Sequence, residues 1–347
     1  MRSPGLFDLQ VNGFAGVDFN DAGLTARRLD AALEAMLQTG VTGCLPTLIT
    51  AHPQQLHERL AALDAAVRDS RLGPAMVPGY HIEGPFLNDG EGYRGCHPAT
   101  AMTDPQPDLI AEIGRGLSRP VLLITLAPER AGGIAAVRRF REMGMVVAAG
   151  HSAADFATIR AAADAGMSMS THLGNGLPQR MHKLDNTLLA QLAEPRLTAC
   201  LIADGHHISP GALRALIDLK GRENCVLVSD AVVAAAAPVG SYDFGGMQVH
   251  HLADGRVVDA ARSGLAGSAL RLDQAVRNVV DWKIAAPAQA FAMAGDQARA
   301  AIAGALRHHQ IVLEPGLACW SGALEPKIER KPAITAGTSH NPTRRIS

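Results

Sequence analysis

Short apolar segments recur along the chain and alternate with longer segments in which apolar residues mark one helical face. The apolar segments have the length of buried strands and lie at residues 6–11, 41–49, 76–82, 121–127, 145–149, 167–171, 197–203 and 225–229. The helical segments lie at residues 24–38, 54–68, 108–117, 132–143, 153–165 and 210–219. Continuous apolar strands are typical of parallel sheets, which are buried on both faces. Strands of this kind alternating with helices predict an α/β fold, a (β/α)8 barrel of the TIM type.

An open, doubly wound sheet would produce the same alternation of strands and helices. Its dinucleotide-binding form carries a Gly-x-Gly-x-x-Gly turn after the first strand, and residues 12–18 contain no such turn. The barrel is therefore the favoured fold.

The pattern changes after residue 230. Residues 242–258 have the character of hairpin strands, with glycine-containing turns at 245–246 and 254–255. We expect a reduced small β domain at residues 240–265, inserted into a barrel domain that spans residues 4–310. Residues 311–347 contain several prolines and glycines, and we expect a C-terminal tail that is partly irregular.

Composition excludes several classes of protein. Among 347 residues, 32 Lys and Arg balance 33 Asp and Glu, which gives no support for a nucleic-acid or membrane surface. The five cysteines are widely spaced and odd in number, which favours a reducing compartment over a disulfide framework. No apolar run reaches the ~18 residues of a membrane span, and the first residues do not resemble a signal or transit peptide. We expect a cytoplasmic protein.

Ionisable residues follow several of the predicted strands. Glu83, His151, His172 and Asp230 each stand at a strand's carboxyl end. In a barrel these ends meet at one face, where chemistry takes place. Any one histidine could instead be a satisfied core or loop residue. Two imidazoles and a carboxylate that converge suit an open catalytic site for Zn²⁺ or a similar divalent ion.

Asp230 is the natural candidate for proton transfer. A metal-bound water must lose a proton, and the leaving nitrogen must gain one. A carboxylate at the end of the last predicted strand would lie beside that water. The alternative is a turn or helix-capping aspartate.

Seven motifs occur together and in a defined order. They are residues 4–13 (PGLFDLQVNG), 81–88 (HIEGPFLN), 150–152 (GHS), 171–176 (THLGNG), 203–207 (ADGHH), 229–231 (SDA) and 265–268 (LAGS). In these motifs the chain resembles the N-acetylglucosamine-6-phosphate deacetylases of the amidohydrolase superfamily, over roughly residues 4 to 280.

The resemblance implies metal-dependent hydrolysis of the N-acetyl group of an amino sugar, N-acetylglucosamine-6-phosphate in the first place. It implies Glu83, His151 and His172 as metal ligands, Asp230 as the general acid and base, and His97 as a group that polarises the amide carbonyl. The implied substrate contacts are Cys96, Asn175, Gly176, Lys183, His207, Leu265, Ala266 and Gly267.

The first motif departs from the wider superfamily, in which many members have His-x-His there and bind a second metal. This chain has Gln10 and Asn12 at those positions. Neutral amides are poor ligands beside imidazole. We therefore expect one divalent ion per site, zinc or else Fe, Co, Mn or Ni, with both amides lining the site.

The phosphate contact also departs from the family, because Lys183 stands where we expect an arginine. Lysine holds phosphate as a point charge without the bidentate fork. Two alternatives therefore stay open: an amidohydrolase of a non-phosphorylated N-acetylhexosamine or of another amide, and a non-catalytic sugar-binding barrel. The resemblance also suggests a homodimer, in which Lys183 serves the neighbouring subunit's site.

Overall fold

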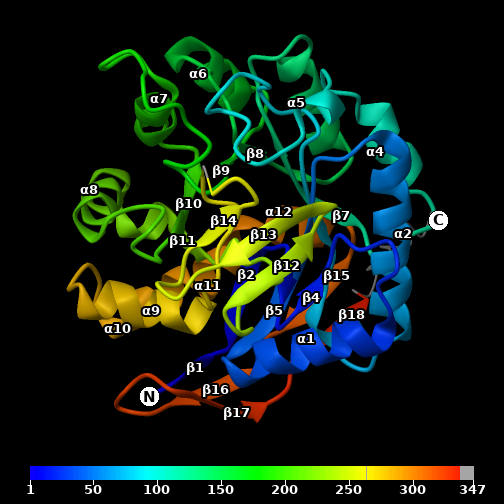
Figure 1. The fold of residues 1–347 in the computed structure, drawn as a ribbon, viewed down its shortest axis with the longest axis vertical. Coiled ribbons are helices and arrows are strands. Elements are labelled where there is room, and N and C mark those ends of the chain that lie inside the picture. Colours follow the sequence, from blue (N-terminus) through cyan, green and yellow to red (C-terminus); the bar gives the residue numbers. More distant parts are fainter. Residues whose placement is uncertain (263, 337–347) are drawn as a thin grey trace, which may run out of the picture.

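The central element of the molecule is a barrel of eight parallel strands. The computed structural model describes residues 1–262 and 264–336. The barrel strands run in the order β11-β10-β9-β8-β7-β6-β5-β2. Their bounds are β2 (Leu6–Val11), β5 (Val41–Ile49), β6 (Tyr80–Glu83), β7 (Val121–Leu126), β8 (Val146–Ala149), β9 (Met169–Ser170), β10 (Thr198–Ile202) and β11 (Cys225–Val228). The predicted barrel is confirmed (Figure 1).

The two ends of this sheet meet just beyond β11. The backbone N–H of Asp230 donates to the carbonyl oxygen of Gln10 over 3.0 Å, and Val11 forms a parallel bridge with Ala231. Ser229 donates its hydroxyl to the same Gln10 carbonyl over 3.2 Å. The first and last strands are thus joined on the side where the candidate residues lie.

Helices surround the barrel, and one follows every strand. They are α1 (Ala26–Gln38), α2 (Pro53–Asp69), α4 (Pro107–Ile113), α5 (Gly133–Glu142), α6 (Phe156–Asp164), α7 (Thr187–Ala193), α8 (Pro210–Lys220) and α9 (Leu272–Asp281). Shorter helices are α3 (Gly73–Met76), α10 (Pro287–Met293), α11 (Asp296–Ala301) and α12 (Ala303–His308).

Two local predictions need correction. The strand expected from residue 76 begins at Tyr80, because Gly73–Met76 forms α3. Helix α7 was not predicted, since its seven residues are too few to show a clear helical period. Asn186 caps this helix by accepting from the N–H of Leu189 over 2.9 Å.

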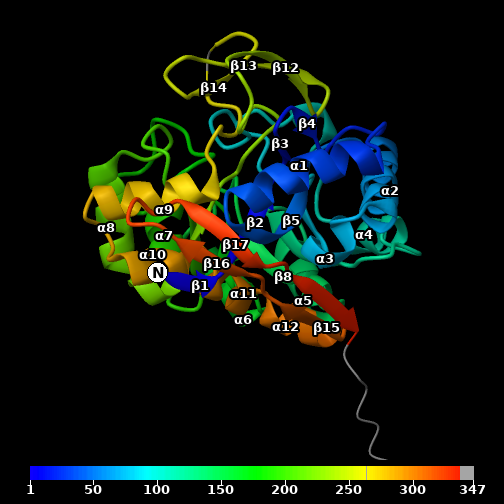
Figure 2. The same ribbon diagram turned by 90° about the horizontal axis from the view of Figure 1, so that it is seen from below.

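A three-stranded insertion covers one end of the barrel. It contains β12 (Gly240–Phe244), β13 (Met247–His251) and β14 (Val257–Asp259), all antiparallel. Figure 2 shows it standing above the barrel, on the side of the short hairpin β3 (Gly13–Phe14) and β4 (Val17–Asp18). Phe244, Val249 and Val257 form its own small apolar core with Val232 and Ile49.

The two ends of the described chain form a second β unit. Strand β1 (Arg2–Pro4) pairs antiparallel with β16 (Leu317–Trp320), which pairs with β17 (Pro326–Arg330). Strand β15 (Ile311–Glu314) pairs with β18 (Ala333–Ala336). Trp320 is buried against Phe291, with ring centroids 4.6 Å apart.

In the first part of the tail that we expected to be partly irregular, residues 311–336, most residues lie in strands. The strands of this second unit escaped prediction because each has only three to five residues. The rest of the expected tail, residues 337–347, lies outside the described residues. A domain boundary near residue 310 stays a prediction.

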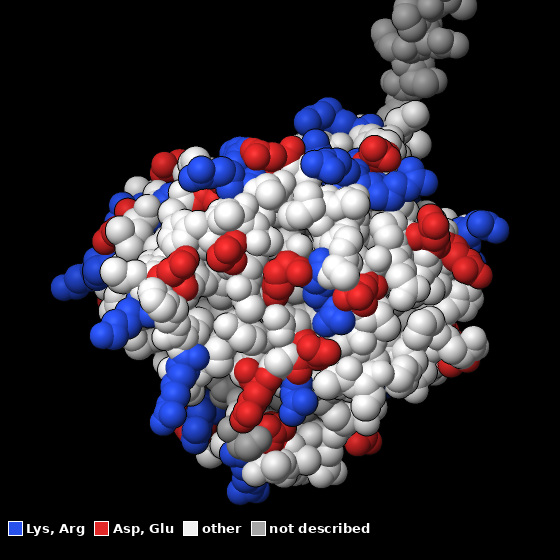
Figure 3. Space-filling view, turned by 90° about the horizontal axis from the view of Figure 1, so that it is seen from above, with Lys and Arg blue, Asp and Glu red and all other residues white. Residues whose placement is uncertain are grey.

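Charges of both signs are distributed over the surface. On the face shown in Figure 3, acidic and basic side chains are interspersed among neutral ones. No helix within the described part of the chain is long and apolar enough to cross a membrane.

Candidate active site

Four ionisable residues stand at equivalent places at the carboxyl ends of barrel strands. Glu83 is the last residue of β6, while His151, His172 and Asp230 are each the second residue after β8, β9 and β11. The latter three have positive φ angles, of 50°, 28° and 48°. Such angles are uncommon for residues other than glycine and cluster at functional sites. The backbone therefore bends sharply where each side chain enters the mouth.

Glu83 is the centre of the cluster. Its Oε1 lies 2.9 Å from Nε2 of His172 and 3.5 Å from Nε2 of His151, and its Oε2 lies 3.7 Å from Nε2 of His97. All four side chains are buried. Burial alone would raise the pKa of Glu83, but the neighbouring imidazoles of His151 and His172 hold it well below its ordinary value. An ionised carboxylate among imidazoles is the result.

The arrangement of His151 fits a metal ligand. Its Nδ1 lies 2.6 Å from the carbonyl oxygen of Tyr93, which can only accept, so Nδ1 carries the hydrogen. Nε2 is then a bare lone pair, and it is buried with no hydrogen-bond partner among the described residues. A ligating histidine has its other nitrogen fixed in this way. The candidate ligand atoms of Glu83, His97 and His151 lie within 4.8 Å of one another. This buried set could bind a metal ion.

Asp230 is held beside the cluster by two amides. Its Oδ1 accepts from Asn12 Nδ2 over 2.8 Å and from Gln10 Nε2 over 3.1 Å. Gln10 Nε2 also lies 3.0 Å from Oε1 of Glu83. Burial, and then the charge of Glu83, raise the pKa of Asp230 to about 6. A carboxyl group that titrates near neutrality can both accept and return a proton.

His97 reaches the same cluster from a loop rather than from a strand end. Its Nδ1 lies 2.9 Å from the hydroxyl of Thr50, which also lies 3.3 Å from the carbonyl oxygen of Glu83. Burial, and then the neighbouring His151, lower the pKa of His97 to about 3. The ring is therefore neutral, and the hydrogen of Thr50 decides which of its nitrogens donates.

A cavity of about 480 Å³ opens over these groups. Most predicted substrate contacts line it: Asn12, Cys96, Asn175, Gly176, His207, Leu265 and Gly267. Gln10 lies below it, in contact with Glu83 and Asp230. Ala266 is buried in the apolar core of the insertion. Lys183 is exposed on the loop before α7 and does not line the cavity.

Two local contacts shape this cavity. Gly176 has a φ of 61°, and a Cβ there would lie 2.5 Å from Nδ1 of His151, so only glycine fits. His207 Nδ1 lies 2.6 Å from Oδ2 of Asp204, which leaves Nε2 as the ring nitrogen available to a ligand.

Several lining residues were not predicted. They are Ile49, Gly92, Gly95, Gly174, Leu177, Gln179, His206, Val232, Phe244, Asp259 and Gly264. Phe244 and Asp259 come from the insertion, and no sequence spacing indicates that it folds over the mouth. His206 adjoins a predicted contact, and this adjacency was its only signal.

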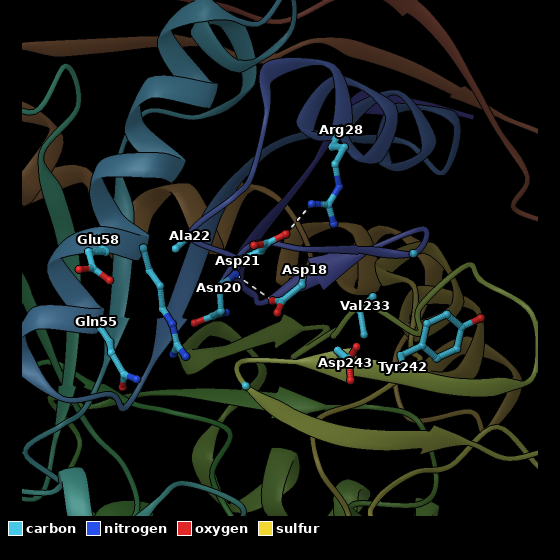
Figure 4. Close-up of a pocket in the computed structure, with 13 residues that line it drawn as sticks. Asp18, Asn20, Asp21, Ala22, Arg28, Gln55, Glu58, Val233, Tyr242 and Asp243 are labelled. Atoms are coloured by element: carbon cyan, nitrogen blue, oxygen red, sulfur yellow. Dashed lines mark hydrogen bonds and ion pairs between the residues drawn. The ribbon is translucent and has the colours of Figure 1, made fainter.

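A larger cavity, of about 590 Å³, lies beside the insertion (Figure 4). Its charged groups are largely paired: Arg28 with Asp21, and Asp18 with the N–H groups of Asn20 and Gly245 at 2.8 Å each. None of the described residues that line it is a histidine or cysteine. The smaller cavity is therefore the candidate active site.

Comparison with known proteins relates the chain to deacetylases of amino-sugar phosphates. An N-acetylgalactosamine-6-phosphate deacetylase from Escherichia coli O157:H7 is 37% identical over 295 residues, or 84% of this chain and 75% of that protein. An N-acetylglucosamine-6-phosphate deacetylase from Lysinibacillus sphaericus is 32% identical over 282 residues, or 80% of this chain and 70% of that protein. No family model matches.

Solved structures show the same relationship. A mutant N-acetyl-D-glucosamine-6-phosphate deacetylase from Mycobacterium smegmatis, in complex with N-acetyl-D-glucosamine-6-phosphate, superposes with a TM-score of 0.83 at 27% identity. The match covers 96% of this chain and 86% of that one. The enzyme of the same name from Pasteurella multocida gives a TM-score of 0.81 at 25% identity, over 97% and 86% of the two chains. The chain belongs to the N-acetylglucosamine-6-phosphate deacetylase family.

Proposed function

We propose that this chain is a hydrolase that converts N-acetylglucosamine-6-phosphate into the free amine and acetate. One observation carries the proposal: a carboxyl group with a pKa near 6 and a buried Glu/His cluster face the same cavity. Amide hydrolysis needs both, since water must be activated and the leaving nitrogen must be protonated. The deacetylase relatives support the substrate.

The proposed ligands of the ion are Glu83, His151 and His172, with zinc favoured by the mixture of imidazole and carboxylate. When bound there, a divalent ion polarises the acetamide carbonyl and lowers the pKa of a water molecule. We propose one ion per site because Gln10 and Asn12 are neutral amides, which are poor ligands beside imidazole.

Asp230 takes the proton of the attacking water and returns it to the departing nitrogen. Gln10 and Asn12 hold its Oδ1, so Oδ2 is the oxygen left for this transfer. His97 stabilises the carbonyl oxygen if its Nε2 carries the hydrogen. In this tautomer the Thr50 hydroxyl donates to Nδ1 of His97, at 2.9 Å. Its contact with the carbonyl oxygen of Glu83 is longer, at 3.3 Å.

The phosphate contact needs a cation that the cavity does not supply. None of the described residues lining it is Lys or Arg, and both Arg180 and Lys183 are exposed on the loop before α7. We propose a homodimer in which Lys183 reaches the neighbouring subunit's site. Lys183→Ala should then raise KM for the phosphorylated sugar without changing kcat, measured alongside the mass of the assembly in solution.

A second candidate substrate is N-acetylgalactosamine-6-phosphate, the epimer at C4. It is favoured by the 37% identity to the deacetylase named for that sugar. The cytoplasm is the proposed location, because all five cysteines are free and three of them are buried.

The test is amine release from four sugars: the two 6-phosphates and the two N-acetylhexosamines that lack phosphate. We expect kcat/KM to be at least 100-fold higher for a 6-phosphate, with Asp230→Asn as the inactive control. Equal kcat/KM values for sugars with and without phosphate would contradict the proposed requirement for a 6-phosphate. No amine from any of the four would overturn it.

A further inference from the structure

Below the Glu/His cluster, a row of hydrogen-bonded side chains crosses the inside of the barrel. The hydroxyl oxygens of Thr171 and Thr125 are 2.6 Å apart, and the oxygen of Thr125 lies 2.8 Å from Nε2 of His81. On the other side, Nδ1 of His81 lies 3.3 Å from the hydroxyl of Thr47. All four residues are at most 4% exposed. The row thus connects β5, β6 and β7 with the residue that follows β9.

One assignment of the hydrogens satisfies every contact in this row. In this assignment the hydroxyl of Thr47 donates to the carbonyl oxygen of Leu45 over 3.1 Å and accepts from Nδ1 of His81. In a neutral ring with Nδ1–H, Nε2 accepts, so Thr125 donates to it. Thr125 then has no hydrogen left for Thr171, which must be the donor. The row is polarised from β9 towards β5.

The row meets the proposed metal ligands at two places. His81 and Glu83 are two residues apart on one strand and therefore point to the same side. Thr125 holds the strand on both sides of Glu83, since its hydroxyl binds His81 and its carbonyl oxygen accepts from the N–H of Gly84 over 3.1 Å. Thr171 directly precedes His172.

A glycine makes the row possible. Thr125 and Thr171 meet across β8, and Gly150 lies between them. A Cβ at Gly150 would be 2.6 Å from Cγ2 of Thr125 and 3.0 Å from Cβ of Thr171. Only glycine fits at position 150, because any side chain there would push Thr125 and Thr171 apart.

We propose that Thr125, with His81 and Thr171, is a positioning element that holds Glu83 and His172 in place for the metal ion. The inference rests on the proposed function, because it takes these two residues as ligands. Loss of a neighbour that orients a metal ligand typically lowers metal affinity 10- to 100-fold. Thr125 touches neither substrate nor ion, so its effect must pass through the ligands.

The test is Co²⁺ binding by the full-length chain, followed by the visible absorption spectrum, which reports ligand geometry without any turnover. Thr125→Val keeps the shape of the side chain but removes the hydroxyl. We expect at least tenfold weaker Co²⁺ binding and an altered spectrum. Thr125→Ser keeps the hydroxyl and should remain within about threefold of the wild type. The matched control is Thr42→Val on β5. Thr42 is buried like Thr125, but its hydroxyl bonds the carbonyl oxygen of Leu6, away from the row.

The outcomes separate the two proposals. If the wild type binds Co²⁺ and Thr125→Val binds it equally with an unchanged spectrum, the positioning role is overturned while the proposed function stands. If the wild type binds no Co²⁺, the proposed function fails and this inference fails with it. If Thr125→Val does not fold, Thr171→Val tests the same row, since it removes only the first donor. Unchanged binding there overturns the inference.

Discussion

The carboxylate of Glu129 accepts the hydroxyl hydrogen of Ser152 over 2.7 Å. Its other oxygen accepts from the N–H of Ala153 at 2.6 Å and from the amide of Asn88 at 2.9 Å. The N–H of Asn88 in turn donates to the carbonyl oxygen of His151 over 3.0 Å. One carboxylate therefore ties the loop after β6 to the loop that carries His151, although it lines no part of the candidate cavity.

Replacing this carboxylate should loosen the site. Glu129→Gln presents an amide N–H to groups that are themselves donors, so it should lower the free energy of unfolding by about 1–3 kcal/mol. We expect kcat/KM to fall about tenfold. Urea denaturation and steady-state kinetics measure the two effects. Glu142→Gln on the exposed side of α5 is the control, and an equal effect there would contradict the role of Glu129.

Asp230→Asn should separate proton transfer from metal binding. The amide oxygen of the variant can still accept from Gln10 and Asn12, so the site should keep its shape. We expect kcat to fall by about 10²–10⁴, with bound metal unchanged. Kinetics combined with elemental analysis measure this. A variant that loses its metal would show that Asp230 acts as a ligand.

Removal of the metal should destabilise the fold as well as abolish activity. A ligand present at about 1,000 times its Kd stabilises the folded state by about 4 kcal/mol. Dialysis against a chelator should therefore lower the urea midpoint, and added Zn²⁺ should restore it. Glu83→Gln, which lacks the central carboxylate, should respond to neither treatment.

Asp8 should make stability fall as the pH rises. Burial raises its pKa from 3.8 to about 7, despite hydrogen bonds from Ser229 and Gln10. Between pH 4 and 7 the unfolded chain has lost this proton while the folded chain keeps it, so rising pH favours unfolding. The cost is at most about 4 kcal/mol and is complete above pH 7. Asp8→Asn should flatten this part of the pH profile and be the more stable protein at pH 8. Lower stability of the variant at pH 8 would refute the prediction.

Gly150→Ala should destabilise the barrel, because its Cβ would collide with Thr125 and Thr171. Overpacking of this kind costs about 1–3 kcal/mol. Gly211→Ala is a matched control, since Gly211 lies in α8 with no atom within 4 Å of an added Cβ. That change should stabilise the protein by about 0.5–1 kcal/mol through helix propensity. Thermal unfolding of both variants measures the contrast.

The barrel and the convergence of its strand ends could be predicted from the sequence, because both follow from local patterns. His151 and His172 end neighbouring strands, and parallel strands place such ends together. The position of His97 could not be derived this way, since it comes from a long loop whose path depends on contacts such as that of His151 with Tyr93. Its role came only from the family resemblance.

Long-range pairing escaped prediction for a related reason. Strand β1, with the sequence Arg-Ser-Pro, is too polar to indicate a strand alone, and the apolar β16 has only four residues. The insertion was expected as strands, but the contacts of Phe244 and Asp259 with the cavity depend on how it folds over the barrel. Tertiary packing decided both.

The pairing of β1 with β16 also sets the order in which the chain can complete its fold. The N-terminal amine of Met1 donates to the carbonyl oxygen of Trp320, 319 positions later in the chain. During synthesis β1 is therefore made before every other described strand, yet its partner β16 is made only after nearly all of them. Until β16 has been made, the backbone N–H and C=O groups of β1 are free to pair with a neighbouring nascent chain. Association of β1 with other chains is thus a risk during synthesis, and this risk ends when β16, with Trp320, has been made and pairs with β1.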